Sequence, residues 1–433
     1  MPFFKKIIPH ILIWEARAVL RRYRPKVIAI TGSVGKTSTK DAIFAALSEH
    51  LYVRKSEKSF NSEIGVPLTI LGLDNAWRNP IKWLWNIVQG FLLIVRRAEY
   101  PQWLVLEVGA DRPGDIRSIA RWLRPDIAVI TSIPEIPVHV EFFDSPEALL
   151  KEKSALAEYL RPCGTLIVNG DDTRTREVAQ WAPLHHCTTI TYGSNPDNDY
   201  TASHDEITYE EDAPAGIRFR VNHEGNSAPV SIMGALGRPR IYAALAALAV
   251  ADAVGIDIVS ASAGLAAWVP SPGRLRILKG IRGLIIIDDT YNSSPAAALA
   301  ALDTLKDIKT RGKKIAVLGD MLELGKYSAG AHRAVGERAA ACADALITVG
   351  FRARAIGEAA LDAGMPEQSI REYELNESVR AGKELEPILQ EGDIVLIKGS
   401  QSMRMEKTVL EIMADPDHAS EFLVRQDPEW LER

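Results

Sequence analysis

The stretch "VIAITGSVGKTSTKDAIF", residues 27–44, places Gly32, Gly35, Lys36 and Thr37 between a run of mostly β-branched residues and a helix-forming sequence. A buried strand that turns on glycines into a helix presents backbone N–H groups and the positive end of the helix dipole to an anion. Lys36 would reach the β- and γ-phosphates of a nucleotide, and the Thr37 hydroxyl would ligate Mg²⁺. This spacing predicts an ATP-binding loop. The alternative is an ordinary strand–helix turn, since an isoleucine replaces the first glycine of the full pattern.

A carboxylate ends the next strongly apolar run that has the character of a strand. Glu107 lies near the end of "WLVLEV", residues 103–108. Ligands of open α/β sheets bind at the carboxyl ends of the strands. A carboxylate there that faces Lys36 and Thr37 would suit Mg²⁺, and the alternative is a solvated carboxylate at a strand end.

One histidine and two lysines follow in "VITSIPEIPVHVEFFDSPEALLKEKSAL", residues 129–156. A strand ends there, a proline-rich loop carries His139, and a helix then brings Lys151 and Lys153. Taken alone, a single histidine is more often structural than a ligand, and a lysine on a helix is usually solvated. These residues therefore remain candidates until a wider pattern supports them.

Acidic and polar side chains also end strands in the second half of the chain. Asp288 and Asp289 precede a turn and a helix in "GLIIIDDTYNSSPAAALAAL", residues 283–302. The stretches "VLGDMLELG" (317–325) and "LIKGSQSMRMEK" (396–407) end their strands in the same way. Three polar loops at one sheet edge predict a site that faces the first half, and the alternative is ordinary polar turns.

Strand-like and helical segments alternate on both sides of residues 268–278, which carry two prolines and a glycine and indicate a linker. This alternation predicts an α/β fold with a central parallel-sheet ATP-binding domain and a second, Rossmann-like α/β domain. Residues 195–232 are polar and alternating, which indicates a small antiparallel excursion. The end of the chain from Asp415 onward indicates a terminal tail. The expected strands are 27–31, 103–108, 127–132, 165–169, 188–192, 283–289, 313–320, 345–350 and 393–400, with helices at 146–160, 173–181 and 240–254.

Composition limits the class of protein. The 433 residues carry a net charge of −5, which gives no basic signature of nucleic-acid binding. The three scattered cysteines fit a reducing cytoplasm and argue against a structural zinc site. Residues 3–24 and 81–97 are basic and amphipathic but too short or interrupted to span a bilayer. They predict either peripheral contact with a membrane or core helices with solvated basic ends.

Taken together, these motifs resemble the Mur ligase family, and within it the MurF branch. The resemblance covers residues 27–407 in the order of the family. Its most specific parts are the "LGDMLELG" and "KGSQSMRME" stretches. The other matching stretches are "TGSVGKTSTK", "NSEIGVPLTIL", "EVGADRPGDI", "HVEFFDSPEALLKEKSAL", "TLIVNGDD", "PGRL" and "IDDTYNSSP".

The resemblance implies an ATP-dependent, ADP-forming amide ligase of peptidoglycan precursor synthesis. It would add D-alanyl-D-alanine to a UDP-N-acetylmuramoyl-tripeptide or a related acceptor through an acyl phosphate. The implied catalytic residues are Lys36, His139 and Lys153, and the implied Mg²⁺ ligands are Thr37, Glu107, His139 and Lys153 as a carbamate. The implied ATP-binding residues are Gly32, Ser33, Val34, Gly35, Lys36, Thr37, Ser38, Arg274, Asp289 and Asn292.

Two departures from the family pattern qualify this expectation. Only 26 residues precede the first strand, where the family usually carries a UDP-binding domain, so we expect one amphipathic helix at 1–26, a central domain at 27–270 and a C-terminal domain at 271–433. The segment "GRPRIYAALAA" (237–247) has Pro239, Arg240 and Ala243 where the family has a histidine and two asparagines near adenine.

Three functions stay open on this evidence. The first is the peptidoglycan ligase, which the resemblance implies acts as a cytoplasmic monomer. The second is a ligase of the same chemistry with another amine or a different, even lipid-linked, carboxylate acceptor. The third is a nucleotide-binding scaffold without catalysis, which the intact candidate residues disfavour.

Overall fold

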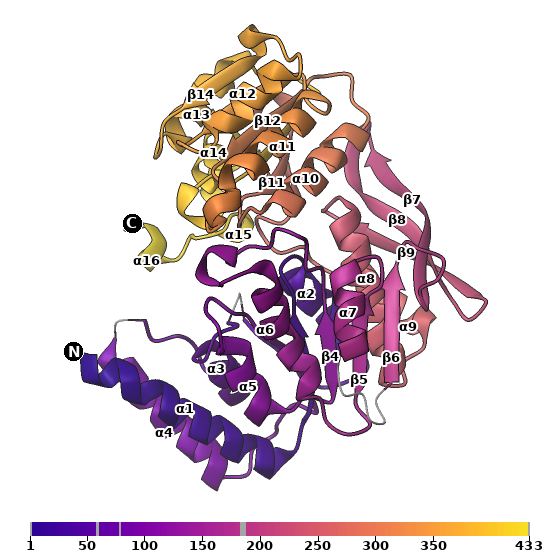
Figure 1. Cartoon of the computed structure of the whole chain (residues 1–433), viewed down its shortest axis with the longest axis vertical. Coiled ribbons are helices and arrows are strands. Elements are labelled where there is room, and N and C mark those ends of the chain that lie inside the picture. Colours follow the sequence, from indigo (N-terminus) through magenta and orange to yellow (C-terminus); the bar gives the residue numbers. More distant parts are fainter. Residues whose placement is uncertain (1, 58–59, 78, 182–187, 432–433) are drawn as a thin grey trace.

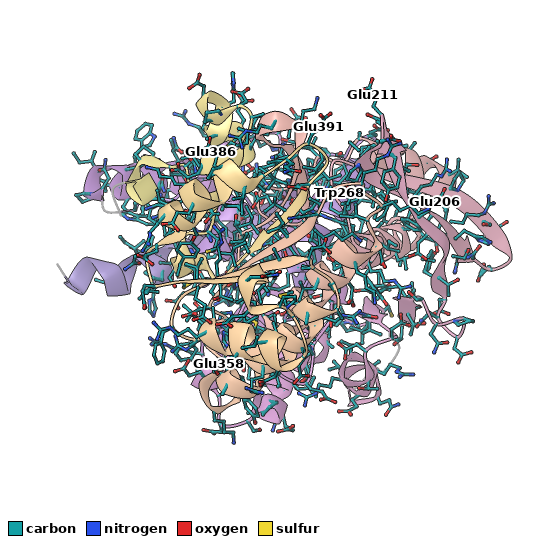
Figure 2. The ribbon with its side chains drawn as sticks, turned by 90° about the horizontal axis from the view of Figure 1, so that it is seen from above. Glu206, Glu211, Trp268, Glu358, Glu386 and Glu391 are labelled. Atoms are coloured by element: carbon teal, nitrogen blue, oxygen red, sulfur yellow. The ribbon has the colours of Figure 1, made fainter. Side chains whose placement is uncertain are left out.

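The computed structural model describes residues 2–57, 60–77, 79–181 and 188–431. Two β-sheets, each flanked by helices on both faces, lie one above the other in Figure 1. The predicted α/β class is therefore confirmed. Viewed from above, Trp268 lies toward the middle of the molecule, whereas Glu206 and Glu211 project at the rim from an antiparallel hairpin, Glu206 from a strand and Glu211 from the turn after it (Figure 2).

The first sheet contains nine strands in the order β2-β3-β1-β4-β5-β6-β7-β8-β9. Its strands from β2 to β7 in this order run parallel, and the antiparallel pairs β7–β8 and β8–β9 form the predicted excursion, which continues the same sheet. Side chains along β1 point alternately to the two faces of the sheet, and they are buried on both. Helices therefore cover both faces. The strands are β1 (Lys26–Thr31), β2 (Val53–Lys55), β3 (Trp103–Glu107), β4 (Ile127–Ile130), β5 (Thr165–Asn169), β6 (Thr188–Gly193), β7 (Tyr200–Glu210), β8 (Ala213–His223) and β9 (Asn226–Met233).

Helices α2, α8 and α9 cover one face of this sheet, and α3, α5, α6 and α7 cover the other. Helix α1 packs on α3 and on α4, and α1 and α4 lie side by side at the end of the molecule farthest from the second sheet (Figure 1). The helices are α1 (Pro2–Tyr23), α2 (Lys36–Ser48), α3 (Gly65–Leu71), α4 (Pro80–Val95), α5 (Asp115–Leu123), α6 (Pro146–Glu158), α7 (Thr173–Trp181), α8 (Arg238–Ala253) and α9 (Ile258–Ala266).

The second sheet contains six strands in the order β10-β11-β15-β12-β13-β14, all parallel except β10. Helices α10 to α12 and helices α13 and α14 lie on opposite faces of it. The strands are β10 (Arg276–Lys279), β11 (Ile285–Asp289), β12 (Lys314–Gly319), β13 (Ala345–Val349), β14 (Ile370–Tyr373) and β15 (Ile394–Lys398). The helices are α10 (Pro295–Asp307), α11 (Ser328–Ala340), α12 (Arg354–Asp362), α13 (Ser378–Leu385), α14 (Glu406–Ile412), α15 (Ala419–Phe422) and α16 (Pro428–Leu431).

Two sequence predictions were wrong at the ends of this domain. The predicted linker 268–278 ends earlier, because Arg276 begins β10, which pairs with β11. The predicted terminal tail packs against the domain instead of extending into solvent. Leu423 is buried, and the guanidinium of Arg425 contacts Glu406 and the backbone of Thr290.

A buried carboxylate lies where α1 packs against α4. Glu15 is 1% exposed, and a Cβ added at Gly90 of α4 would lie 2.3 Å from its Oε2. That oxygen has no hydrogen-bond partner in the described part of the chain. Burial raises the pKa of Glu15 from 4.5 to about 7.

We expect the replacement Glu15→Gln to remove a pH dependence of stability. Between pH 4.5 and about 7 the folded protein holds a proton that the unfolded chain releases, so the free energy of unfolding falls as the pH rises. Above pH 7 the ionised Glu15 costs about 1–3 kcal/mol, which the glutamine avoids. Urea unfolding at pH 5 and pH 8 measures the difference. An equal difference between variant and wild type at both pH values would contradict this expectation.

Candidate active site

The loop after β1 is held open by two glycines and by the neighbouring strand. Gly35 has φ +91° and directly precedes α2, and Gly32 has φ +144°. A Cβ at Gly32 would lie 1.9 Å from Oγ1 of Thr131, so this position requires glycine. The backbone N–H groups of Ser33 and Val34 donate to the Ser132 carbonyl at 2.8 and 3.2 Å. The loop is therefore fixed against the end of β4.

The strand order places a carboxylate beside this loop. Because β1 pairs with β3 in parallel, Glu107 ends next to Ile30 and close to α2. Oγ1 of Thr37 donates to Oε2 of Glu107 at 2.7 Å, and Asn61 donates to Oε1 at 3.0 Å. Both Thr37 and Glu107 are buried. A hydroxyl and a carboxylate held together in this way are the oxygen donors that Mg²⁺ prefers, so these residues fit a magnesium ion.

Two lysines converge on the same loop carbonyl. Nζ of Lys36 and Nζ of Lys153 each donate to the Gly32 carbonyl at 2.9 Å. Burial holds the pKa of Lys153 well below its usual value, and the charge of Lys36 lowers it further. Burial also lowers the pKa of Lys36, which the Glu107 carboxylate partly opposes. The other candidate on α6, Lys151, is exposed to solvent.

The start of α6 explains how Lys153 reaches the loop. The Ser145 hydroxyl accepts a hydrogen bond from the Ala148 N–H, and Pro146 occupies the first turn. The helix therefore begins at a defined residue. Lys153 lies on its buried face, whereas Lys151, two residues earlier, points outward.

His139 joins the two domains. It has φ +67° and precedes a short 3-10 helix, Val140–Phe142. Its Nδ1 lies 2.6 Å from Oε2 of Glu323, which follows β12 in the second domain. This contact with His139 lowers the pKa of Glu323. The imidazole therefore contacts an acid from the second domain in this structure.

The carboxyl edge of the second sheet faces the loop. Asp289 and Lys398 lie opposite each other at the ends of β11 and β15, and their side chains are 2.5 Å apart. Lys398 also donates to the Asn292 carbonyl at 2.9 Å. Arg274 crosses to the first domain, where Nη2 donates to Oγ1 of Thr37 at 2.8 Å. Its guanidinium lies 4.1 Å from the centre of the Tyr291 ring.

Arg240, one of the departures from the family pattern, contacts the segment that carries Arg274. Its side chain is 2% exposed, donates to the Arg274 carbonyl and lies over the Trp268 ring at 5.0 Å. Burial lowers the pKa of Arg240 to about 10. This arginine therefore positions the segment that carries Arg274.

A cavity of about 410 Å³ lies between the two sheet edges. The residues implied by the resemblance all line it except Gly32 and Lys153. The lining candidates are Ser33, Val34, Gly35, Lys36, Thr37, Ser38, Glu107, His139, Arg274, Asp289 and Asn292. No group of three or more His, Cys, Asp or Glu side chains suited to a metal occurs within the described ranges.

Three further residues were not singled out from the sequence. Asn61 donates to Glu107, Lys398 contacts Asp289, and Glu323 contacts His139. They occur in stretches that matched the family, namely "NSEIGVPLTIL", "KGSQSMRME" and "LGDMLELG", and that match was the available signal for them. Arg240 was noted only as a departure from the pattern, and its contact with the Arg274 backbone was not predicted.

This fold and cavity define a class, a nucleotide-dependent enzyme with an ATP-binding loop in one α/β domain and a second α/β domain facing it. A family model described as the Mur ligase middle domain matches residues 85–251, and one described as the Mur ligase glutamate ligase domain matches residues 273–401. The UDP-N-acetylmuramoyl-tripeptide–D-alanyl-D-alanine ligase of Bacillus subtilis is 31% identical over 401 residues, which cover 93% of this chain and 79% of that protein.

Solved structures give the same result. The crystal structure of MurF ligase from Thermotoga maritima in complex with ADP superposes with a TM-score of 0.75 at 25% identity, over 93% of this chain and 82% of that one. MurF from Acinetobacter baumannii gives the same TM-score and identity over 94% and 80%. The chain belongs to the Mur ligase family and is an ATP-dependent, ADP-forming ligase of peptidoglycan precursor synthesis. The predicted resemblance and enzyme class are confirmed.

Proposed function

We propose that the chain joins the carboxylate of a UDP-N-acetylmuramoyl-tripeptide, or a related acceptor, to the amino group of D-alanyl-D-alanine. The observation that carries the proposal is the contact of Arg274 with Thr37, which brings a cation from the second domain onto the ATP-binding loop of the first. The substrates are proposed from the names of the relatives. The cavities around the central one support a reaction that uses three substrates.

The proposed reaction has two steps. An oxygen of the acceptor carboxylate attacks the γ-phosphorus of ATP, a P–O bond forms, and ADP leaves with the electrons of the broken β–γ bridge. The amine then attacks the acyl carbon, an amide C–N bond forms, and inorganic phosphate leaves with the former carboxylate oxygen. The amine loses one proton overall.

The cationic side chains of the central cavity suit the first step. Lys36 and Arg274 approach from opposite domains and would neutralise charge on the transferring phosphoryl group. A Mg²⁺ ion held by Thr37 and Glu107, together with the proposed ligands His139 and Lys153, would supply Lewis-acid charge to the phosphate oxygens. For Lys153 this requires that its amine nitrogen adds to CO₂ with loss of a proton, which makes a carbamate.

Three larger spaces share lining residues with this cavity, and we assign one to each of the three substrates. A space of about 470 Å³ shares Val34, Gly35 and Pro239 with it. Its other walls include the rings of Tyr192 and Tyr242. We propose that the nucleoside of ATP occupies this space and stacks on its apolar and aromatic walls.

The proposed amine site is a cavity of about 670 Å³ that shares His139, Asn292 and Gln401 with the central one. Its walls include Arg404 and Lys407, two cations suited to the carboxylate of a dipeptide. Glu323 lies at the end near the central cavity and would attract the ammonium group.

The proposed acceptor site is a groove of about 1130 Å³ that shares Thr37, Arg274 and Tyr291 with the central cavity. The groove runs outward to Ile8 of α1 and Trp83 of α4. This apolar outer end favours the second candidate function, in which the acceptor is lipid-linked rather than linked to UDP.

Three further proposals follow from the sequence. We propose that residues 1–26, 27–270 and 271–433 act as the N-terminal helix, the central domain and the C-terminal domain. We propose that the enzyme works as a monomer in the cytoplasm. We also propose that residues 3–24 and 81–97 make peripheral contact with a membrane. Across the described ranges, no helix is both long and apolar enough to cross a bilayer.

Phosphate release tests the proposed function. The assay supplies ATP and Mg²⁺ with the UDP-linked tripeptide, a lipid-linked analogue or no acceptor, each with and without D-alanyl-D-alanine. We expect sustained phosphate release only when an acceptor and the amine are both present, with a product whose mass equals the two substrates minus water. Equal phosphate release without an acceptor, or no ligated product from any pair, would contradict the proposal.

A further inference from the structure

The outer face of α4 is apolar and uncovered in this structure. Six large apolar side chains lie on one side of the helix, and we call them the α4 face: Ile81, Leu84, Trp85, Val88, Phe91 and Val95, which are 40–78% exposed. Their spacing of three or four residues puts them on one stripe. The opposite side carries the buried Asn86 and Gly90, and Gly90 faces α1.

Helix α1 and the segment before α4 carry further exposed apolar side chains, namely Ile7 and Trp14 of α1 and Trp77. Together with the α4 face they make up half of the exposed large apolar side chains in the described residues. An apolar concentration of this kind on one pair of helices marks a contact surface rather than ordinary exposed residues.

The exposed charged side chains described in α1 and in residues 80–97 are all basic, and the exposed acids Asp74 and Glu99 lie just outside residues 80–97. Residues 80–97 contain Lys82, Arg96 and Arg97 and no acidic residue. The described, exposed charged side chains of α1 are the basic Arg17, Arg21 and Arg22, and its single acid, Glu15, is buried. The whole chain carries a net charge of −5, so this basic region is local.

We infer that the α4 face docks on the surface of an anionic lipid bilayer, an inference that rests on the peripheral contact proposed above. An apolar stripe flanked by basic residues lies in the interface of a bilayer, with tryptophans at the level of the headgroups. A second copy of this chain is a poorer occupant, because two such faces would bring like charges together.

Docking gives the groove a defined orientation. Ile8 of α1 and Trp83 of α4 line its outer end, and Thr37 and Arg274 line its inner end. With the α4 face on the bilayer, the outer end of the groove lies near the lipid and the phosphoryl-transfer site lies away from it. An acceptor held in the membrane could then present its carboxylate to the inner end.

Flotation with vesicles tests the inference. The full-length protein is mixed with vesicles of phosphatidylcholine alone or with about one third phosphatidylglycerol, at about 0.1 M salt. We expect the wild type to float with the anionic vesicles and at least tenfold less with the neutral ones. Phe91→Glu should reduce binding to the anionic vesicles at least tenfold.

Phe351→Glu is the matched control, since Phe351 is 72% exposed on the second domain, away from this surface. It should bind the vesicles like the wild type. Thermal unfolding checks that both variants fold.

Absence of wild-type flotation, or equal flotation of the wild type and Phe91→Glu, would overturn the inference. So would self-association of the protein that Phe91→Glu abolishes while no vesicle binding occurs. Phosphate release with a water-soluble acceptor in the absence of vesicles separates this result from the proposed function, because the ligation can hold where docking fails.

Discussion

Replacing Lys153 with alanine should lower the rate of ligation at least about 10³-fold, equivalent to about 4 kcal/mol of transition-state stabilisation. The buried amine of Lys153 donates to the same loop carbonyl as Lys36, which lines the central cavity. As a carbamate it would add an oxygen ligand beside Thr37 and Glu107, which no alanine can replace. The steady-state rate of phosphate release, with acceptor and amine present, measures the effect.

Lys151→Ala is the matched control, because Lys151 lies on the same helix but is exposed. It should retain the wild-type rate. Wild-type enzyme kept free of CO₂ should lose activity and regain it when bicarbonate is added, whereas Lys153→Ala should not respond. A Lys153→Ala enzyme that folds and works within tenfold of the wild type would refute the role given to this lysine.

The second large effect is expected at Arg274. Arg274→Ala removes the hydrogen bond to Thr37 and the contact with the Tyr291 ring, and with them the cation that we propose the second domain brings to the phosphate. We expect kcat to fall about 10²–10³-fold, as for loss of a cation that stabilises phosphoryl transfer. Affinity for ADP should change less, because the loop around Lys36 remains in the first domain.

Rapid-quench kinetics and calorimetric ADP binding separate these two quantities. Arg282→Ala serves as the control, since Arg282 lies in the same domain and bonds to the backbone of Glu386 and Leu389. If Arg274→Ala weakened ADP binding as strongly as it lowered kcat, Arg274 would act in binding the nucleotide and not in the transfer step.

The local sequence pattern was sufficient to predict the helices and strands that have a clear apolar periodicity. The expected strand over 127–132 and the expected helix over 173–181 agree with β4 and α7 to within two residues, because apolar period and turn residues define them locally. The short strands β2, β10 and β14 escaped prediction. Three or four residues give too little periodicity, and their pairing partners come from distant segments.

The contacts within the candidate site and the packing of the C-terminal segment depend on residues that are distant in the sequence. The sequence predicted that Lys36, Thr37 and Glu107 lie together, because Lys36 and Thr37 follow β1 and Glu107 ends the neighbouring parallel strand β3. The contact of His139 with Glu323 joins two domains, and no local pattern encodes that pairing. The terminal segment was mistaken for a tail because the burial of Arg425 depends on backbone carbonyls more than 130 residues earlier in the chain.

The roles of the two basic amphipathic segments also could not be distinguished from the sequence. From the sequence, 3–24 and 81–97 have similar character and allow either a core or a membrane role. Packing separates them, because α1 buries Leu12, Ala16 and Val19 whereas α4 keeps an uncovered apolar face. Gly90 allows α1 to approach α4 on the side opposite that face, which leaves the face outward.

The central claim is that two sheet edges meet over one cavity in which the acceptor carboxylate takes the γ-phosphoryl group of ATP. Acceptor labelled with ¹⁸O in its carboxylate tests this directly, since the attacking oxygen remains on phosphorus when the amine displaces phosphate. Mass spectrometry of the released phosphate should show one ¹⁸O atom transferred per ligation from a doubly labelled carboxylate. Phosphate that contains no ¹⁸O, released at the rate of ligation, would show that the carboxylate never received the phosphoryl group.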